Sequence, residues 1–133
     1  MKVKFIFIDP EKQKAEIIEC QNNEVENLAH QKVANFLDTF VCFIDDLKTE
    51  FYVFCDDNGI NNSFVSATTS NGEPLLFGKL LICKLDSTGI MGLTDEDIDY
   101  IMHHLATEYL LINENDFKII HTLLITEVTQ TTV

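Results

Sequence analysis

The chain has 133 residues, and its 22 Asp and Glu side chains stand against nine lysines and no arginine, giving a formal net charge of −13. A hydrophobic fraction of 46% with ten phenylalanines can bury a core, which argues against a disordered acidic tail. Nucleic acid is disfavoured as a direct ligand because phosphates are neutralised by lysine and arginine, so a basic protein is the expected partner.

The N-terminal third predicts a hairpin followed by a helix. Residues 2–8 are β-branched and aromatic and break at Asp9-Pro10, after which residues 15–19 return as a second strand. From residue 22 to about Phe36, apolar side chains recur every three or four positions, so Phe36 is expected on the core face of a helix. Asn22 or Asn23 is the expected N-cap.

Buried strands and one long loop are expected in the middle of the chain. Residues 39–44 and 51–55 are very apolar and are expected to pair antiparallel across residues 45–50. Residues 56–74 are rich in Asp, Asn, Ser, Thr and Gly, which predicts a loop whose middle reaches the core. Residues 75–85 are expected to form one further strand.

The clearest element is a second helix from Thr94 to about residue 109. Thr94-Asp-Glu-Asp97 resembles a capping box, and an apolar stripe follows it. Residues 117–128 fit either a strand or a helix, and the Thr/Gln tail is expected to fray. We therefore expect one α+β domain over residues 1–133, with a main body at 1–109, a C-terminal segment at 110–133, and a small mixed or mainly antiparallel sheet of about five strands packed against two helices.

The apolar stretches and the cysteines indicate the expected cellular location of the protein. The N-terminal apolar stretch is shorter than that of a signal peptide, and no apolar run approaches the roughly 20 residues that cross a bilayer, so a cytoplasmic location is expected. The four cysteines show neither metal-site nor redox spacing and lie in or beside apolar stretches, which predicts buried, reduced thiols.

Carboxylates at the start of the second helix are the first candidate for partner binding. No basic residue stands near them in the sequence, so this surface is expected to carry uncompensated charge comparable to that of a nucleic-acid strand. The alternative is that these acids serve only the helix start. A second group lies at the two ends of the predicted 39–55 hairpin, where charged residues are also common simply because they are solvated. The expected partner-binding residues are Asp95, Glu96, Asp97 and Asp99, followed by Asp45, Asp46, Glu50, Asp56 and Asp57.

The sequence gives little support for catalysis, metal binding or cofactor binding. His103 and His104 form i,i+4 pairs with acids but lack a full ligand set, so no metal is expected. Nucleophile motifs and phosphate-binding glycine loops are absent from the sequence, so no cofactor and no enzymatic activity are expected.

Several short motifs carry a family resemblance over residues 1 to about 105. The chain reads Met1-Lys-Val, Asp9-Pro-Glu-Lys12, Phe54-Cys-Asp-Asp-Asn-Gly59, Phe77-Gly-Lys-Leu-Leu-Ile82 and Gly92-Leu-Thr-Asp-Glu-Asp-Ile98. In this order it resembles a family of small uncharacterised proteins carried by phages, plasmids and integrative elements of bacteria. That resemblance implies a mobile-element context, in which compact acidic proteins obstruct host defence nucleases, and it assigns no catalytic residues.

The leading functional hypothesis is a non-enzymatic acidic inhibitor of the anti-CRISPR or anti-restriction type, which mimics nucleic-acid charge and blocks the basic groove of a host protein. One alternative is a small-molecule-binding or minor enzymatic domain that uses the 56–74 loop. Another is an obligate homo-oligomer joined through the C-terminal segment, in which the charge serves only solubility.

Overall fold

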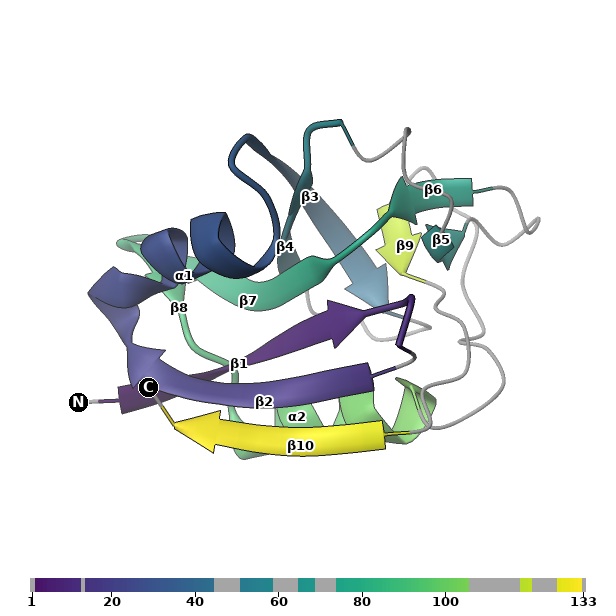
Figure 1. The fold of residues 1–133 in the computed structure, drawn as a ribbon. Coiled ribbons are helices and arrows are strands. Elements are labelled where there is room, and N and C mark those ends of the chain that lie inside the picture. The colour runs from purple at the N-terminus through teal and green to yellow at the C-terminus, as the bar shows by residue number, and fades with distance from the viewer. Residues whose placement is uncertain are drawn as a thin grey trace.

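The computed structural model describes residues 2–12, 14–44, 51–58, 65–68, 74–105, 118–120 and 127–132 (Figure 1). Its centre is a sheet with the strand order β10-β2-β1-β7-β4-β3-β9, to which β8 is joined through β7, and β5 and β6 form a second small sheet. The contacts are antiparallel except for β10 with β2 and β3 with β9, which confirms a mainly antiparallel α+β fold with two helices. The strands are Lys2–Asp9 (β1), Lys14–Gln21 (β2), Leu37–Ile44 (β3), Phe51–Asp56 (β4), Val65–Thr68 (β5), Pro74–Phe77 (β6), Leu80–Asp86 (β7), Gly89–Met91 (β8), Lys118–Ile120 (β9) and Glu127–Thr132 (β10).

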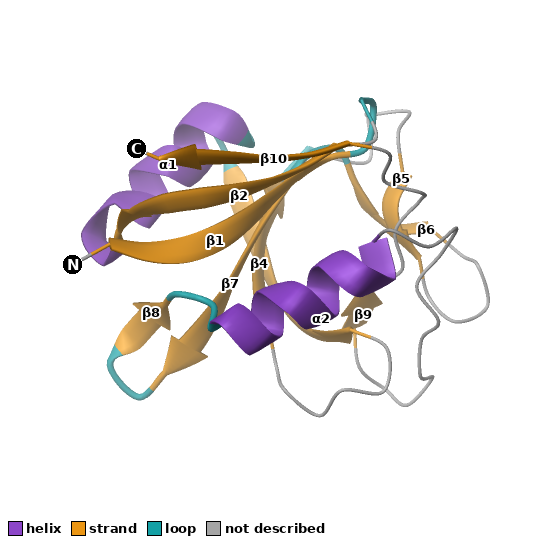
Figure 2. Ribbon diagram, turned by 90° about the horizontal axis from the view of Figure 1, so that it is seen from below, coloured by secondary structure: helices purple, strands orange, loops and turns teal. Residues whose placement is uncertain are grey.

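Figure 2 shows one helix on each face of the main sheet. Along β1, Phe5 and Phe7 belong to a cluster that contains buried residues of helix α1 (Val25–Lys32), while Ile6 and Ile8 belong to a cluster with helix α2 (Asp95–Leu105). Successive strand side chains point to opposite faces, so the continuous apolar run in β1 supplies both cores.

The N-terminal hairpin is confirmed, whereas the first helix is shorter than expected. β1 and β2 pair antiparallel, and a 3-10 turn at Asn22–Glu24 leads into α1. The expected cap is wrong, because the N-cap is Gln21 for the 3-10 turn and Glu24 for α1, and not Asn22 or Asn23. The Gln21 N–H donates to Glu24 Oε1 at 2.8 Å. At its other end, α1 stops at Lys32, four residues before Phe36.

Phe36 does not lie on the core face, and its side chain is 71% exposed. The Val33 N–H closes the helix by donating to the Ala29 carbonyl, and the chain then turns into β3. There the Phe36 carbonyl accepts a hydrogen bond from the Asp57 N–H at 3.0 Å. Because the backbone at Phe36 is already on the path of β3, the helical period no longer decides where its ring points.

The expected strand at 75–85 is two strands of different sheets. β6 pairs with β5, and β7 pairs with β1 and β4. Gly78 separates them with φ of 76°, a left-handed conformation that glycine adopts at low cost. The expected 56–74 loop contains β5, and buried Ser66 confirms that its middle reaches the interior.

A short strand and the C-terminus extend the sheet beyond the expected five strands. β8 returns along β7 after a turn at residues 87–88, and Gly89, the first residue of β8, has φ of 127°. The open choice at 117–128 resolves as strand over Lys118–Ile120, while residues 121–126 lie outside the described residues. The expected frayed tail is wrong, because Glu127–Thr132 pairs in parallel with β2 and occupies a strand edge that otherwise carries unpaired backbone groups.

The part of the chain with described positions contains no helix long and apolar enough to span a membrane. Cys20, Cys55 and Cys83 are buried and form no disulfide, which confirms the predicted reduced thiols for these three. The side chain of Cys42 lies outside the described residues.

These thiols give a prediction that alkylation can check. Burial raises the pKa of Cys83 to about 12, and burial, followed by the charges of Asp38, Asp56 and Asp57, raises the pKa of Cys55 to about 12. The reactive species is the thiolate, so both thiols are expected to stay unmodified by iodoacetamide near neutral pH until the protein unfolds. Peptide mass spectrometry measures this, and native-state alkylation of Cys55 at the rate of a free thiol would contradict it.

Candidate functional site

Helix α2 begins with a reciprocal pair of hydrogen bonds between Thr94 and Asp97. The Thr94 N–H donates to Asp97 Oδ2 at 2.9 Å, and the Asp97 N–H donates to Thr94 Oγ1 at 3.1 Å. The expected capping box with Asp in place of Glu is therefore confirmed. Asp97 is 8% exposed, and Lys84 Nζ of β7 lies 2.9 Å from the same carboxylate oxygen.

The Asp97 carboxylate is held in its charged form by these contacts. Burial alone raises the pKa of Asp97, but hydrogen bonds from Lys84 and Thr94 and the positive charge of Lys84 outweigh it, and the pKa is lowered. A carboxylate bound in this way serves the helix start and the β7–α2 contact. It is not available to a partner protein.

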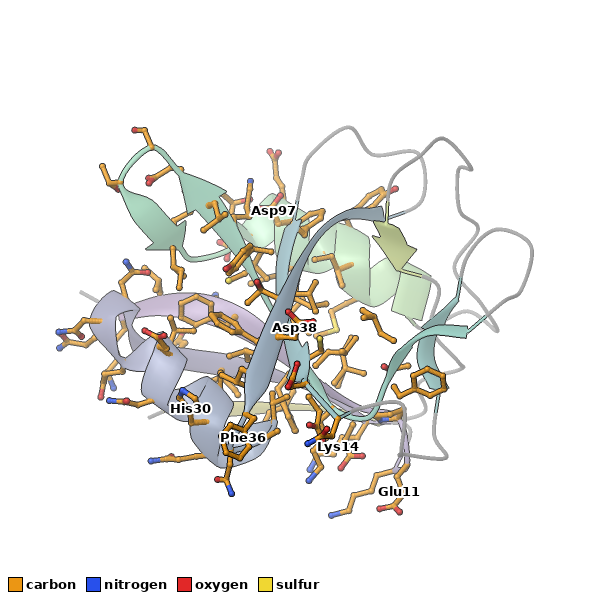
Figure 3. All side chains as sticks on the ribbon, turned by 90° about the horizontal axis from the view of Figure 1, so that it is seen from above. Glu11, Lys14, His30, Phe36, Asp38 and Asp97 are labelled. Carbon is orange, nitrogen blue, oxygen red and sulfur yellow. The ribbon has the colours of Figure 1, made fainter. Side chains whose placement is uncertain are left out.

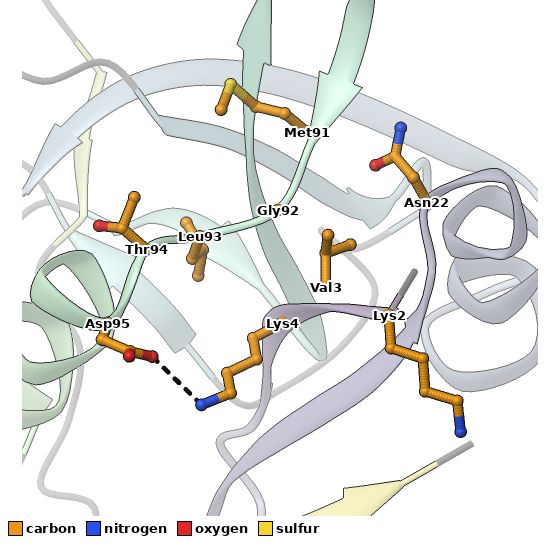
Figure 4. A pocket seen from close by; sticks show the side chains of 9 residues that line it. All are labelled: Lys2, Val3, Lys4, Asn22, Met91, Gly92, Leu93, Thr94 and Asp95. Carbon is orange, nitrogen blue, oxygen red and sulfur yellow. Dashed lines mark hydrogen bonds and ion pairs between the residues drawn. The ribbon is translucent and has the colours of Figure 1, made fainter.

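Asp95 is paired as well, although at the surface. Lys4 Nζ of β1 lies 3.1 Å from Asp95 Oδ1, at the rim of an open depression of about 590 Å³ (Figure 4). Lys2 also lines this depression, but its side chain extends away from Asp95 in Figure 4, so Lys4 is the lysine of β1 that pairs with the start of α2. Asp95 is 85% exposed at its side chain, and exposed ion pairs contribute little to stability.

The acids at the start of α2 are therefore not uncompensated, which corrects the sequence-based expectation. The lysines that neutralise Asp95 and Asp97 come from β1 and β7, which lie 91 and 13 positions away in the chain. Glu96 and Asp99 are exposed and form no ion pair within the described ranges. Two of the four expected partner-binding residues thus remain open for binding at this end.

A second group of carboxylates gathers at the open end of the β3–β4 hairpin. The register places Asp38 opposite Cys55 and Leu37 opposite Asp56, with Asp57 next along the chain. The charges of Asp38, Asp56 and Asp57 all contribute to the raised pKa of the Cys55 thiol, so the three carboxylates lie near this thiol. We call these three residues the hairpin-end carboxylates. The other expected residues of the hairpin, Asp45, Asp46 and Glu50, lie outside the described residues.

Beside the hairpin-end carboxylates lies a groove of about 420 Å³, which we call the Phe36 groove. Figure 3 shows the exposed Phe36 ring next to His30 of α1. Acidic and aromatic side chains share its wall, and no lysine occurs among its described lining residues. The lining includes Glu26, His30, Phe36, Tyr52, Asp57 and Ile90.

Hydrogen bonds and ring packing fix the shape of this groove. The Tyr52 and Phe54 rings on β4 meet edge to face with centroids 5.4 Å apart. At the other wall, His30 Nδ1 lies 3.0 Å from the Asn35 carbonyl oxygen. Since that oxygen only accepts, Nδ1 carries the proton, and the imidazole ties α1 to the turn that presents Phe36.

No group of three or more His, Cys, Asp or Glu side chains suited to a metal ion occurs within the described segments. The side chains of His103 and His104, which the sequence singled out, lie outside them.

Sequence reasoning placed Asp56 and Asp57 in a candidate surface but missed Glu26, Phe36 and Tyr52 of the groove beside them. The spacing of Tyr52 and Phe54 was the one readable signal, because i,i+2 residues share a strand face. The exposure of Phe36 depends on the helix ending at Lys32, and no residue in the apolar repeat of this segment indicates that end.

No protein-family model, no curated protein and no solved structure matches this chain at a significant level.

Proposed function

We propose that this protein is a non-enzymatic acidic interaction protein that binds the cationic surface of a partner protein. The partner class that we propose is a nucleic-acid-binding host protein such as a defence nuclease, whose basic groove the acidic surface would occupy. The family resemblance suggests this class, and the fold alone assigns no function.

One observation carries the proposal: exposed carboxylates of two elements meet around the Phe36 groove with no lysine in its described lining. Glu26 comes from α1 and Asp57 follows β4, and both line the groove. Such a surface attracts a basic partner, accelerates its association and weakens binding as salt screens the field.

The exposed pair Glu96 and Asp99 extends this proposal to a second, smaller surface at α2. Asp95 and Asp97 contribute less there, because Lys4 and Lys84 already hold them. This distribution favours partner binding centred on the hairpin end over binding centred on the start of α2. The homo-oligomer alternative gains no specific observation, since the C-terminal strand β10 pairs with β2 of its own chain.

Affinity capture tests the proposal. The protein is immobilised and exposed to nuclease-treated lysate of a bacterial host, and the retained proteins are eluted with salt and identified. A variant carrying Glu26→Gln, Asp57→Asn, Glu96→Gln and Asp99→Asn serves as the comparison. We expect a basic nucleic-acid-binding protein that elutes as salt rises, and about tenfold or greater loss of its affinity in the variant.

Displacement then connects binding to function. We expect the wild-type protein to release DNA or RNA from the recovered partner, whereas the variant releases less at equal concentration. Equal capture by both proteins, or retained proteins that are not basic and do not respond to salt, would refute the proposed function. Circular dichroism confirms that the variant keeps its fold, as expected for four exposed positions.

A further inference from the structure

We propose that the Phe36 groove is a docking site for an arginine side chain of the partner protein. This inference rests on the proposed function and specifies the chemistry of its contact. The groove juxtaposes an exposed aromatic ring with carboxylates from two separate elements, Glu26 of α1 and Asp57 after β4. A guanidinium group stacks on aromatic faces and accepts no hydrogen bonds, so its donors need acceptors of this kind.

The exposure of Phe36 sets this position apart from the rest of the described surface. Phe36 at 71% and Leu85 at 45% are the exposed large hydrophobic residues of the described ranges. Leu85 lies near the β7–β8 turn and lines neither the Phe36 groove nor the depression beside Asp95. Phe36 instead lies in a groove whose floor already contains Tyr52 and the buried ring of Phe54. Aromatic residues that line such a groove are frequent centres of protein–protein contacts.

The same combination of groups already binds a cation elsewhere in the molecule. Lys32 Nζ lies 5.1 Å from the centroid of the Phe7 ring and 3.4 Å from Glu16 Oε1. There, one ammonium group uses an aromatic face and a carboxylate at once. The Phe36 groove presents an aromatic ring and carboxylates, and its described lining contains no cation of its own.

Arginine fits this groove better than lysine, and it identifies the occupant as another protein. The planar guanidinium can stack on a ring while donating two parallel hydrogen bonds to a carboxylate, and it is more weakly hydrated than an ammonium group. These 133 residues contain no arginine, so neither a second copy of them nor another segment among them supplies one. The occupant must therefore come from a different polypeptide.

Peptide titration followed by NMR tests the assignment. The probes are hexa-arginine and hexa-lysine peptides, which carry equal charge, and binding is followed by amide shifts of the labelled protein. We expect the arginine peptide to bind several-fold more tightly than the lysine peptide. Its binding is expected to shift the Asp57 amide, which donates to the Phe36 carbonyl.

Two matched comparisons locate the contact. Phe36→Ala is expected to lower affinity for hexa-arginine about fivefold and to abolish the arginine preference, whereas Leu85→Ala, the other exposed apolar position, leaves both unchanged. The double variant Glu26→Gln/Asp57→Asn is expected to weaken binding more than Glu96→Gln/Asp99→Asn, although both remove two charges. Both substituted pairs are exposed, so the fold is retained.

The outcomes separate this inference from the proposed function. Equal binding of the two peptides, or unchanged binding by Phe36→Ala, overturns the arginine site while salt-dependent capture of a basic partner still supports the acidic interaction protein. Loss of hexa-arginine binding equal in the two charge-matched double variants also overturns the site. Failure of both peptides to bind, together with capture of no basic partner, refutes both proposals.

Discussion

Replacing Asp97 by Ala is expected to lower the free energy of unfolding by about 2–4 kcal/mol. The substitution removes the acceptor for the Thr94 N–H at the start of α2 and leaves Lys84, whose side chain is 20% exposed, without its carboxylate. Removing one partner of a buried pair costs more than the pair contributes, because the remaining charge stays desolvated. Urea unfolding followed by circular dichroism measures the change.

Asp95→Ala is the matched control for this substitution. Asp95 also pairs with a lysine at the start of α2, but its side chain is 85% exposed, so the expected loss is about 0.5 kcal/mol or less. A further variant, Asp97→Ala combined with Lys84→Met, is expected to recover part of the lost stability by removing the stranded charge. Equal losses for Asp95→Ala and Asp97→Ala would show that burial of the Lys84 pair does not stabilise the fold.

The contribution of Asp97 also depends on pH, with a defined sign. Because the pKa of the Asp97 carboxyl is lowered in the folded state, its charged form stabilises the fold above the pKa of the unfolded chain, about 3.9. As the pH falls through the folded-state pKa, this stabilisation is lost. The difference in unfolding free energy between wild type and Asp97→Asn is expected to shrink as the pH falls below about 4. Comparing the two proteins cancels the titration of the other carboxylates.

Replacing Gly92 by Ala is expected to lower the free energy of unfolding by about 2–3 kcal/mol. A Cβ at Gly92 would lie 2.5 Å from Val3 Cβ and 3.2 Å from the Lys4 nitrogen, so the segment must move away from β1. That movement strains the hydrogen bond from the Leu93 N–H to the Lys4 carbonyl, now 2.8 Å long. The same segment leads into α2, so the loss is expected to include the packing of that helix.

A double-variant cycle identifies the contact responsible. Val3→Gly removes the Cβ that a new methyl group at Gly92 would meet first. The two substitutions together are therefore expected to destabilise by less than the sum of their separate effects, as determined by urea unfolding. Simple additivity would place the cost of Gly92→Ala somewhere other than at the Val3 contact.

Sequence patterns predicted the structure correctly where side chains close in sequence determine the local backbone. The run at residues 2–8 and the return at 15–19 predicted β1 and β2, and the capping pattern at Thr94 predicted the start of α2. In these cases the backbone choice follows from side chains close in sequence, whose hydrophobicity and hydrogen bonding leave few alternatives.

Prediction was less successful where a neighbour from elsewhere in the chain decided the outcome. Phe36 continues the helical period, yet the backbone turns into β3 and binds the Asp57 N–H, so its ring is exposed. The Thr-rich C-terminus carries no strong apolar pattern, yet it pairs with β2, because an open strand edge accepts any chain that can satisfy its backbone groups.

The candidate site divides in the same way. The sequence by itself determined the charge of the protein, the absence of arginine and the acidic composition of the α2 start and the hairpin end, because these depend on residue identity alone. Only the tertiary structure decided which carboxylates stay open: it brought Lys4 and Lys84 to Asp95 and Asp97, and it set Glu26 and Asp57 around an exposed Phe36. The physical reason is that charge compensation acts through space over a few ångströms, whereas the lysines concerned are brought there by strand pairing and helix packing.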